Sequence, residues 1–125
     1  MTSTEQLTAL TRALSTVRSP LVGSEYDLHA MIAAALRGGG FVVEPEARLG
    51  PGCRVDFLVG RVAVEVKRGR PPRARLMQQC RRYLEQDAVD ALILVVEKTA
   101  NLPDTLCGKP LITFYLNRLW GVALP

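Results

Sequence analysis

The chain has 125 residues, of which 48% are hydrophobic and 22% charged, and this size and composition indicate one folded domain and exclude a disordered or collagen-like protein. The longest uninterrupted apolar run, residues 30–36, is far shorter than the ~20 residues that cross a bilayer. The amino terminus also lacks the apolar stretch of a signal peptide, so we expect a cytoplasmic protein with no membrane partner. The three cysteines have no close spacing and are expected to be reduced core thiols, at Cys53, Cys80 and Cys107.

The first part of the sequence predicts two helices and an irregular strand. Apolar residues three and four apart predict an amphipathic helix over residues 3–18, which ends before Pro20. A second helix is expected from residue 24 to residue 36, where three consecutive glycines follow. Residues 41–49 have the pattern of a strand, and Pro45 makes it an edge strand or a bulged one.

The sequence after residue 49 predicts a hairpin followed by a helical crossover. Strands are expected over residues 54–59 and 62–67, with Gly60 and Arg61 as a type II′ turn between them. Two prolines then precede a helix over residues 73–87. The last elements are a buried parallel strand, a short helix or turn, and a final strand, over residues 91–96, 101–108 and 111–116. This order predicts an α/β domain with a mixed sheet flanked by helices on both faces.

Positive charge is concentrated in one segment of the chain. Residues 61–82 hold eight basic residues and one acid, a net charge of +7, whereas the rest holds 8 basic and 11 acidic residues, a net charge of −3. Seven of the eight basic residues are arginines, whose guanidinium groups suit phosphate oxygens. The asymmetry favours a surface that binds a polyanion, with an ordinary solvated surface as the alternative.

The predicted hairpin sets two carboxylates against each other. With the turn at Gly60 and Arg61, Asp56 pairs directly with Glu65, and like charges at a Cβ separation of about 4.5–5.5 Å destabilise a hairpin. Lys67 falls on the same face as Glu65, because side chains alternate along a strand. The opposite, core-directed face is expected to hold Val55, Phe57, Val62, Val64 and Val66.

This arrangement is typical of a site for a divalent cation. Asp56 and Glu65, with the backbone carbonyl of Val66, supply the oxygen ligands that Mg²⁺ prefers, and a bound cation would remove the repulsion between the acids. The alternative is an ion triad in which Lys67 alone neutralises them. The metal site is favoured because the hairpin runs directly into the basic segment.

The run Val55-Asp56, followed nine residues later by Glu65-Val66-Lys67, resembles the D…(D/E)-x-K signature of the PD-(D/E)XK nuclease superfamily, with Val55 in place of the proline. The resemblance implies that Asp56 and Glu65 ligate the metal. It also implies that Lys67 orients or helps to deprotonate the attacking water and stabilises charge at phosphorus.

The same resemblance implies a fold and further site residues. The fold is a restriction-endonuclease-like domain over residues 23–125, whose αβββαβ core covers residues 24–96, with residues 1–22 as an N-terminal helical extension. Gln79 and Tyr83 match the Q-x-x-x-Y element of RecB-type and lambda exonuclease members.

Two residues of the second helix compete for a place at the metal. Glu25 lies where many members keep a helical acid, and His29, four residues later, lies where RecB-type members place a histidine. We prefer Glu25, because Mg²⁺ favours oxygen over imidazole, and keep His29 as the alternative.

The resemblance implies a nuclease that uses Mg²⁺, with Mn²⁺ as a substitute, to hydrolyse DNA by a metal-activated water, as in small phage, mobile-element, recombination and repair nucleases. The alternative is a nuclease-fold module that binds nucleic acid without cutting it. In both cases the partner is DNA, and the expected backbone contacts are Arg68, Arg70, Arg73, Arg75 and Arg82. A homodimer through the N-terminal helix would suit symmetric cutting of two strands.

Overall fold

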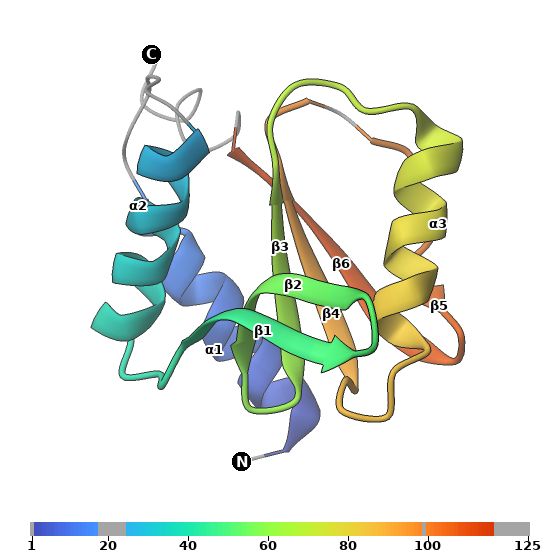
Figure 1. Ribbon diagram of the computed structural model, residues 1–125. Coiled ribbons are helices and arrows are strands. Elements are labelled where there is room, and N and C mark those ends of the chain that lie inside the picture. The colour runs from blue at the N-terminus through green and yellow to red at the C-terminus, as the bar shows by residue number, and fades with distance from the viewer. Residues whose placement is uncertain (1, 18–24, 99, 117–125) are drawn as a thin grey trace.

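The computed structural model describes residues 2–17, 25–98 and 100–116, which form one mixed sheet with helices on both faces (Figure 1). The six strands lie in the order β1-β2-β3-β4-β6-β5. The α/β class predicted from the sequence is therefore confirmed. The elements are α1 (Ser3–Leu14), α2 (Glu25–Gly38), β1 (Glu44–Gly50), β2 (Cys53–Val59), β3 (Val62–Lys67), α3 (Arg73–Leu84), β4 (Ala91–Val96), β5 (Thr105–Leu106) and β6 (Lys109–Tyr115).

The β2–β3 hairpin has the predicted turn and register. Val59 lies opposite Val62, and this register sets Asp56 against Glu65. Gly60, the first residue of the turn, has a φ of 61°. A type II′ turn requires such a left-handed value at this position, and glycine adopts it without steric cost.

β4 is the buried parallel strand that the sequence predicts. All six of its residues are buried, and it pairs in parallel with β3 on one side and with β6 on the other. α3 makes the crossover from β3 to β4. Parallel strands end at the same edge of a sheet, so Lys67 at the end of β3 lies beside Val96 at the end of β4.

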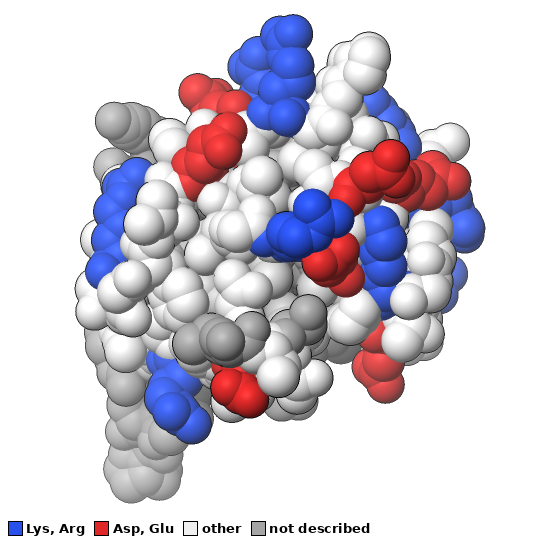
Figure 2. Space-filling model, turned by 90° about the horizontal axis from the view of Figure 1, so that it is seen from below, with Lys and Arg blue, Asp and Glu red and all other residues white. Residues whose placement is uncertain are grey.

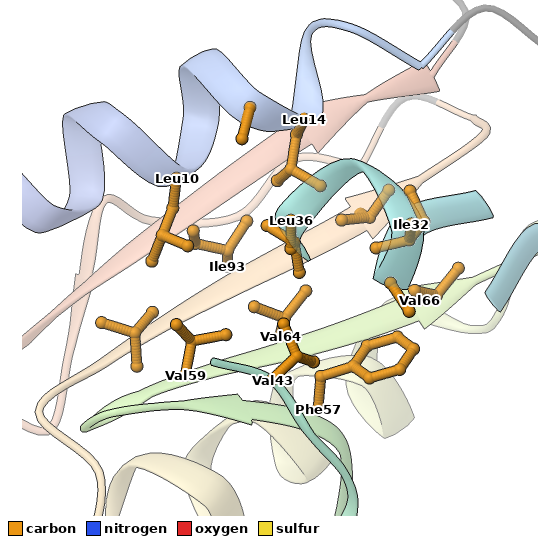
Figure 3. Packing of buried hydrophobic residues seen from close by; sticks show 14 of the residues in the cluster. Leu10, Leu14, Ile32, Leu36, Val43, Phe57, Val59, Val64, Val66 and Ile93 are labelled. Atoms are coloured by element: carbon orange, nitrogen blue, oxygen red, sulfur yellow. The ribbon is translucent and has the colours of Figure 1, made fainter. Parts of the chain in front are cut away.

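Two apolar clusters cover the two faces of the sheet. On one face, α1 and α2 pack against strand residues that include Val64 and Ile93 (Figure 3). On the other face, α3 packs against residues that include Leu92. The leucine stripe of α1 is used inside the chain, since Leu10 and Leu14 are fully buried in the first cluster.

β2 passes from one cluster to the other along its length. Figure 1 shows the strand crossing the front of the sheet beside β1 and then bending down toward the β2–β3 turn. Val55 packs in the cluster of α3, whereas Phe57 packs in the cluster of α1 and α2. The expectation that Val55 and Phe57 share one core-directed face is therefore wrong, because the strand twists and bends at Asp56, between them.

β1 is an edge strand, as predicted, but its irregularities do not lie at Pro45: the backbone kinks at Glu46, and the register with β2 shifts between Arg48 and Gly50. Pro45 pairs regularly with Phe57, and Glu46 has a left-handed φ of 47°. The proline ring holds its own φ near −65°, so a left-handed kink at this place must fall on the neighbouring residue.

Three further expectations need correction. α1 and α3 end at Leu14 and Leu84, a few residues before the predicted ends. Residues 101–108 hold the short strand β5 and no helix. Cys53 and Cys80 are buried thiols, but Cys107 is exposed in the turn after β5. None of the helices in the described ranges has the length and apolar character needed to cross a membrane.

The burial of α1 predicts a large effect of shortening one of its leucines. We expect Leu14→Ala to lower the free energy of unfolding by about 2–5 kcal/mol, because it leaves a cavity in the first cluster. Urea denaturation measures this change. Thr4→Ala, at an exposed position of the same helix, should change stability by less than about 0.5 kcal/mol. Equal effects of the two substitutions would mean that α1 does not pack on the sheet.

Candidate active site

The candidate site lies where β2 and β3 separate, beyond their last paired residues. The backbone N–H of Asp56 donates to Glu65 Oε1 at 2.9 Å, and the N–H of Val66 donates to Asp56 Oδ2 at 2.8 Å. Each carboxylate thus accepts a hydrogen bond from the opposite strand, as a main-chain carbonyl does in a regular hairpin. The two bonds fix both predicted acids between the strands.

Glu65 is a buried carboxylate with one cation beside it. Its side chain is 6% exposed, and Lys67 Nζ lies 3.3 Å from Glu65 Oε2. Burial raises the pKa of Glu65 and the charge of Asp56 raises it further, whereas the N–H of Asp56 and the charge of Lys67 lower it. Because the net shift is upward, the protein alone does not fully stabilise the ionised Glu65.

Two residues of α3 complete the surroundings of Glu65. Gln79 Nε2 donates to the Tyr83 hydroxyl oxygen at 2.9 Å and lies 3.4 Å from Glu65 Oε2. Burial, and then the charge of Glu65, raise the pKa of Tyr83, so its hydroxyl remains protonated. The predicted pair thus lies on one face of α3, against the buried acid, as a spacing of four residues allows.

Asp56 faces the opposite helix, α2. Asp56 Oδ2 lies 3.5 Å from His29 Nε2, and the imidazole ring packs edge-on against Phe57 with the ring centroids 5.9 Å apart. His29 Nε2 is shielded from solvent and has no hydrogen-bond partner in the described part of the chain. Glu25 begins α2 one turn earlier, but its side chain lies outside the described residues, so our preference for Glu25 as a ligand stays a prediction.

A groove of about 590 Å³ runs along the α2 side of Asp56. Its walls come from α2, with His29 and Arg37, and from β1 and β2, with Pro45 and Phe57. The groove gives solvent access to Asp56, whereas Glu65 is enclosed by α3. The two acids therefore differ in accessibility although they are hydrogen-bonded across the same pair of strands.

The donor atoms at this place suit a hard divalent cation in kind. Asp56 and Glu65 offer the carboxylate oxygens that such a cation favours. His29 adds a nitrogen that has no hydrogen-bond partner among the described residues. Within the described ranges, no three or more His, Cys, Asp or Glu side chains form a group that could hold a metal ion. A cation here would therefore need the Val66 carbonyl, water or phosphate for its remaining positions.

The basic segment is divided between two ends of the molecule. Arg61 lies at the β2–β3 turn, where its Nε is 2.8 Å from Asp90 Oδ2 and its Nη2 donates to the carbonyl of Asp87. Figure 2 views this end of the molecule and shows basic and acidic side chains next to each other. Arg61 is thus neutralised at the turn and does not belong to a basic surface beside Lys67.

Of the five arginines predicted to contact DNA, three already have protein partners. Arg70 and Arg75 are exposed, and their guanidinium groups make no hydrogen bond or ion pair with a described residue. The other three are Arg68 with the carboxylate of Glu97, Arg73 with the carbonyl of Asn101, and Arg82 with the carbonyl of Gly52.

Glu97 is a residue that the sequence reasoning missed. Its carboxylate accepts from the Gly69 N–H at 2.8 Å and from Arg68 Nε at 3.3 Å. These bonds tie the segment after Lys67 to the end of β4. The signal that could have revealed it is an acid directly after a buried parallel strand, beside the strand that carries Lys67.

Comparisons of the chain with models of protein families, with curated proteins and with solved structures find no significant match.

The raised pKa of Glu65 predicts how stability depends on pH in the absence of metal. A folded-state pKa above the ordinary value of 4.5 means that folding is favoured more below 4.5 and that this contribution is lost as the pH rises through the folded pKa. Glu65→Gln removes the ionisable group and therefore this decrease in stability at high pH. We expect the free energy of unfolding of Glu65→Gln, relative to that of the parent, to be greater at pH 8 than at pH 5. Urea denaturation in the presence of chelator measures it.

Glu44→Gln, which neutralises an exposed carboxylate on β1, is the matched control and should show no such difference. If Glu65→Gln destabilised the protein equally at both pH values, the ion pair with Lys67 would outweigh the burial of Glu65.

Proposed function

We propose that this chain is a metal-dependent deoxyribonuclease that uses Mg²⁺ or Mn²⁺ to hydrolyse phosphodiester bonds. The observation that carries the proposal is the convergence of Asp56, Glu65 and Lys67 at the point where β2 and β3 separate, with Gln79 against the buried acid. An ordinary structural hairpin has no need of two opposed carboxylates in this position.

Each residue has a role in the proposed reaction. Asp56, Glu65 and the Val66 carbonyl would hold the cation, which would lower the pKa of a water molecule and neutralise charge on the phosphate. Lys67 would donate a hydrogen bond to the attacking water or to a phosphate oxygen. Gln79 and Tyr83 would keep the Glu65 carboxylate oriented, since Gln79 lies within 3.4 Å of it.

The order of the elements supports the resemblance to PD-(D/E)XK nucleases. α2, β1, β2, β3, α3 and β4 follow one another in the order αβββαβ, and the candidate residues lie on β2 and β3. We propose on this basis the restriction-endonuclease-like core, a DNA partner, and a role in phage or mobile-element replication, recombination or repair.

The second candidate function is a nuclease-fold module that binds nucleic acid without cutting it. The observation in its favour is that the described side chains do not form a metal-binding group of three or more His, Cys, Asp or Glu residues. Both functions use the same basic surface, so cleavage and metal binding separate them.

Asp56→Asn and Lys67→Ala should both impair cleavage severely, but by different routes. Asp56→Asn keeps an oxygen that can accept from the Val66 N–H but removes the negative charge, so both cleavage and calorimetric Mn²⁺ binding should be lost. Lys67→Ala should lower the cleavage rate by about 10²–10³-fold and leave the ion bound. The assay uses linear, nicked, circular and branched DNA with and without Mg²⁺.

Asp104→Asn, which neutralises an exposed acid in the loop before β5, is the control for a change of charge and should cleave like the parent protein. Cleavage by Asp56→Asn at the parent rate would rule out the nuclease assignment. DNA binding by the parent without cleavage under any metal condition would select the binding module.

Substitutions in α2 test which residue completes the metal site. Because Mg²⁺ favours oxygen, we expect Glu25→Gln to lose most activity, while His29→Asn, which alters a group 3.5 Å from Asp56, loses a few-fold at most. Cleavage rates at saturating Mg²⁺ measure both effects. If His29→Asn is inactive and Glu25→Gln is active, the metal ligand from α2 is His29.

A further inference from the structure

Two arginines face each other directly on the β1–β2 hairpin. Arg48 of β1 is the cross-strand partner of Arg54 of β2, and both residues are exposed. Neither guanidinium group makes a hydrogen bond or an ion pair with a described residue. Like charges directly opposite on an antiparallel pair destabilise it, and no described residue supplies an anion that would compensate this pair.

The two arginines border a hollow of about 400 Å³ at the end of the hairpin, which Gly52 and Cys53 also line. A third guanidinium lies at its margin, since Arg82 Nη2 of α3 donates to the Gly52 carbonyl at 2.5 Å. Cys53 lies close enough to Arg82 and to Glu65 for the charges of both to affect its pKa. After the larger effect of burial, which raises its pKa, the charge of Arg82 lowers the pKa of Cys53 and that of Glu65 raises it.

The hollow lies next to the candidate active site along the same strand. Arg54 precedes Asp56 by two residues on β2, so their Cα atoms are about 6.6 Å apart. Val55 between them packs toward α3, whereas Asp56 lies 3.5 Å from His29 of α2. Arg54, as the neighbour of Val55 before the bend, also leaves the strand on the side away from α3. Glu46 of β1, with its left-handed φ of 47°, interrupts the strand beside Asp56. The backbone of a nucleic-acid strand bound at Asp56 could therefore extend along the same hairpin to Arg54.

We propose that Arg48 and Arg54 form a phosphate-binding site, with Arg82 at its edge, that holds the nucleic-acid backbone one or two nucleotides away from Asp56. The inference rests on the proposed function for its ligand. Guanidinium groups bind phosphate oxygens through paired hydrogen bonds, and a bound phosphate supplies the negative charge that the opposed arginines lack. This site is separate in sequence from the basic segment that follows Lys67.

The test compares Arg48→Gln and Arg54→Gln with Arg12→Gln, which removes the same charge from an exposed position on α1. Binding of a labelled oligonucleotide is measured in Ca²⁺ and in chelator, over a range of salt. Each hairpin substitution should make the negative slope of log affinity against log salt less steep, by roughly 0.9 for duplex DNA or roughly 0.7 for a single strand. Arg12→Gln should leave the slope unchanged.

A second measurement does not depend on cleavage or on DNA. Without ligand at low salt, Arg48→Gln and Arg54→Gln should raise the melting temperature relative to Arg12→Gln, because they relieve the opposed charges. Arg54→Lys keeps the charge but loses the paired hydrogen bonds, so it should keep the low melting temperature and bind DNA more weakly than the parent.

The outcomes separate this inference from the proposed function. If both hairpin variants bind DNA with the slope of Arg12→Gln, the site is overturned. If inorganic phosphate raises the melting temperature of the parent and not of Arg54→Gln while DNA binding is unchanged, the ligand is a free anion and the nucleic-acid assignment is overturned. If the hairpin variants show the expected less steep slope but the parent protein never cleaves DNA, the phosphate site is supported and the nuclease function is rejected.

Discussion

The opposition of Asp56 and Glu65 across the β2–β3 hairpin is the constraint on which the arrangement of the site depends. The register of a two-residue turn brings the acids together, and their like charges would separate the strands if nothing opposed them. The structure opposes this with hydrogen bonds from backbone N–H groups of the facing strand. The hydrogen bonds from the facing strand thus hold the two strands together against the repulsion between the two carboxylates.

The bend of β2 lets these two acids have different surroundings. β2 pairs with β1 on both sides of the bend, but it packs Val55 toward α3 before the bend and Phe57 toward α2 after it. Asp56 lies between these two parts, beside the groove and His29, while Glu65 on β3 is enclosed with Gln79 and Tyr83. One acid is therefore accessible from solvent and the other is buried, and burial raises the pKa of the enclosed Glu65.

Local patterns predicted most of the fold and the centre of the site. The turn at Gly60 fixes the register of β2 and β3, and the apolar run of β4 marks a buried parallel strand, so both were predictable from neighbouring residues. The position of Val55 was not, because alternation along a strand assumes that the strand stays straight. The pairing of Arg48 with Arg54 also escaped the sequence, since it depends on the register between β1 and β2, which the kink at Glu46 and the later shift in register obscure.

The basic segment shows the same limit of sequence reasoning. Its arginines are close in sequence, but Arg61 lies at the turn with Asp90, and Arg68 is engaged by Glu97. A run of positive charge predicts an electrostatic excess and does not predict which groups remain unpaired. Arg70 and Arg75 of the segment make no hydrogen bond or ion pair with a described residue, and the same holds for Arg48 of β1, outside the segment. The positive potential available to a polyanion therefore comes from two separate parts of the chain on either side of Asp56 in the sequence.

The balance of charge at the site also bears on the order in which ligands can bind. Asp56 and Glu65 carry two negative charges when ionised, and Lys67, 3.3 Å from Glu65, carries one positive charge. A phosphate group that approached this set alone would meet a net negative charge at short range, where the buried position of Glu65 weakens screening by solvent. Lys67 cannot both neutralise Glu65 and bind the phosphate with full strength. A divalent cation reverses the net charge, so cation and phosphate should each strengthen the binding of the other, and by linkage the two effects must be equal in free energy.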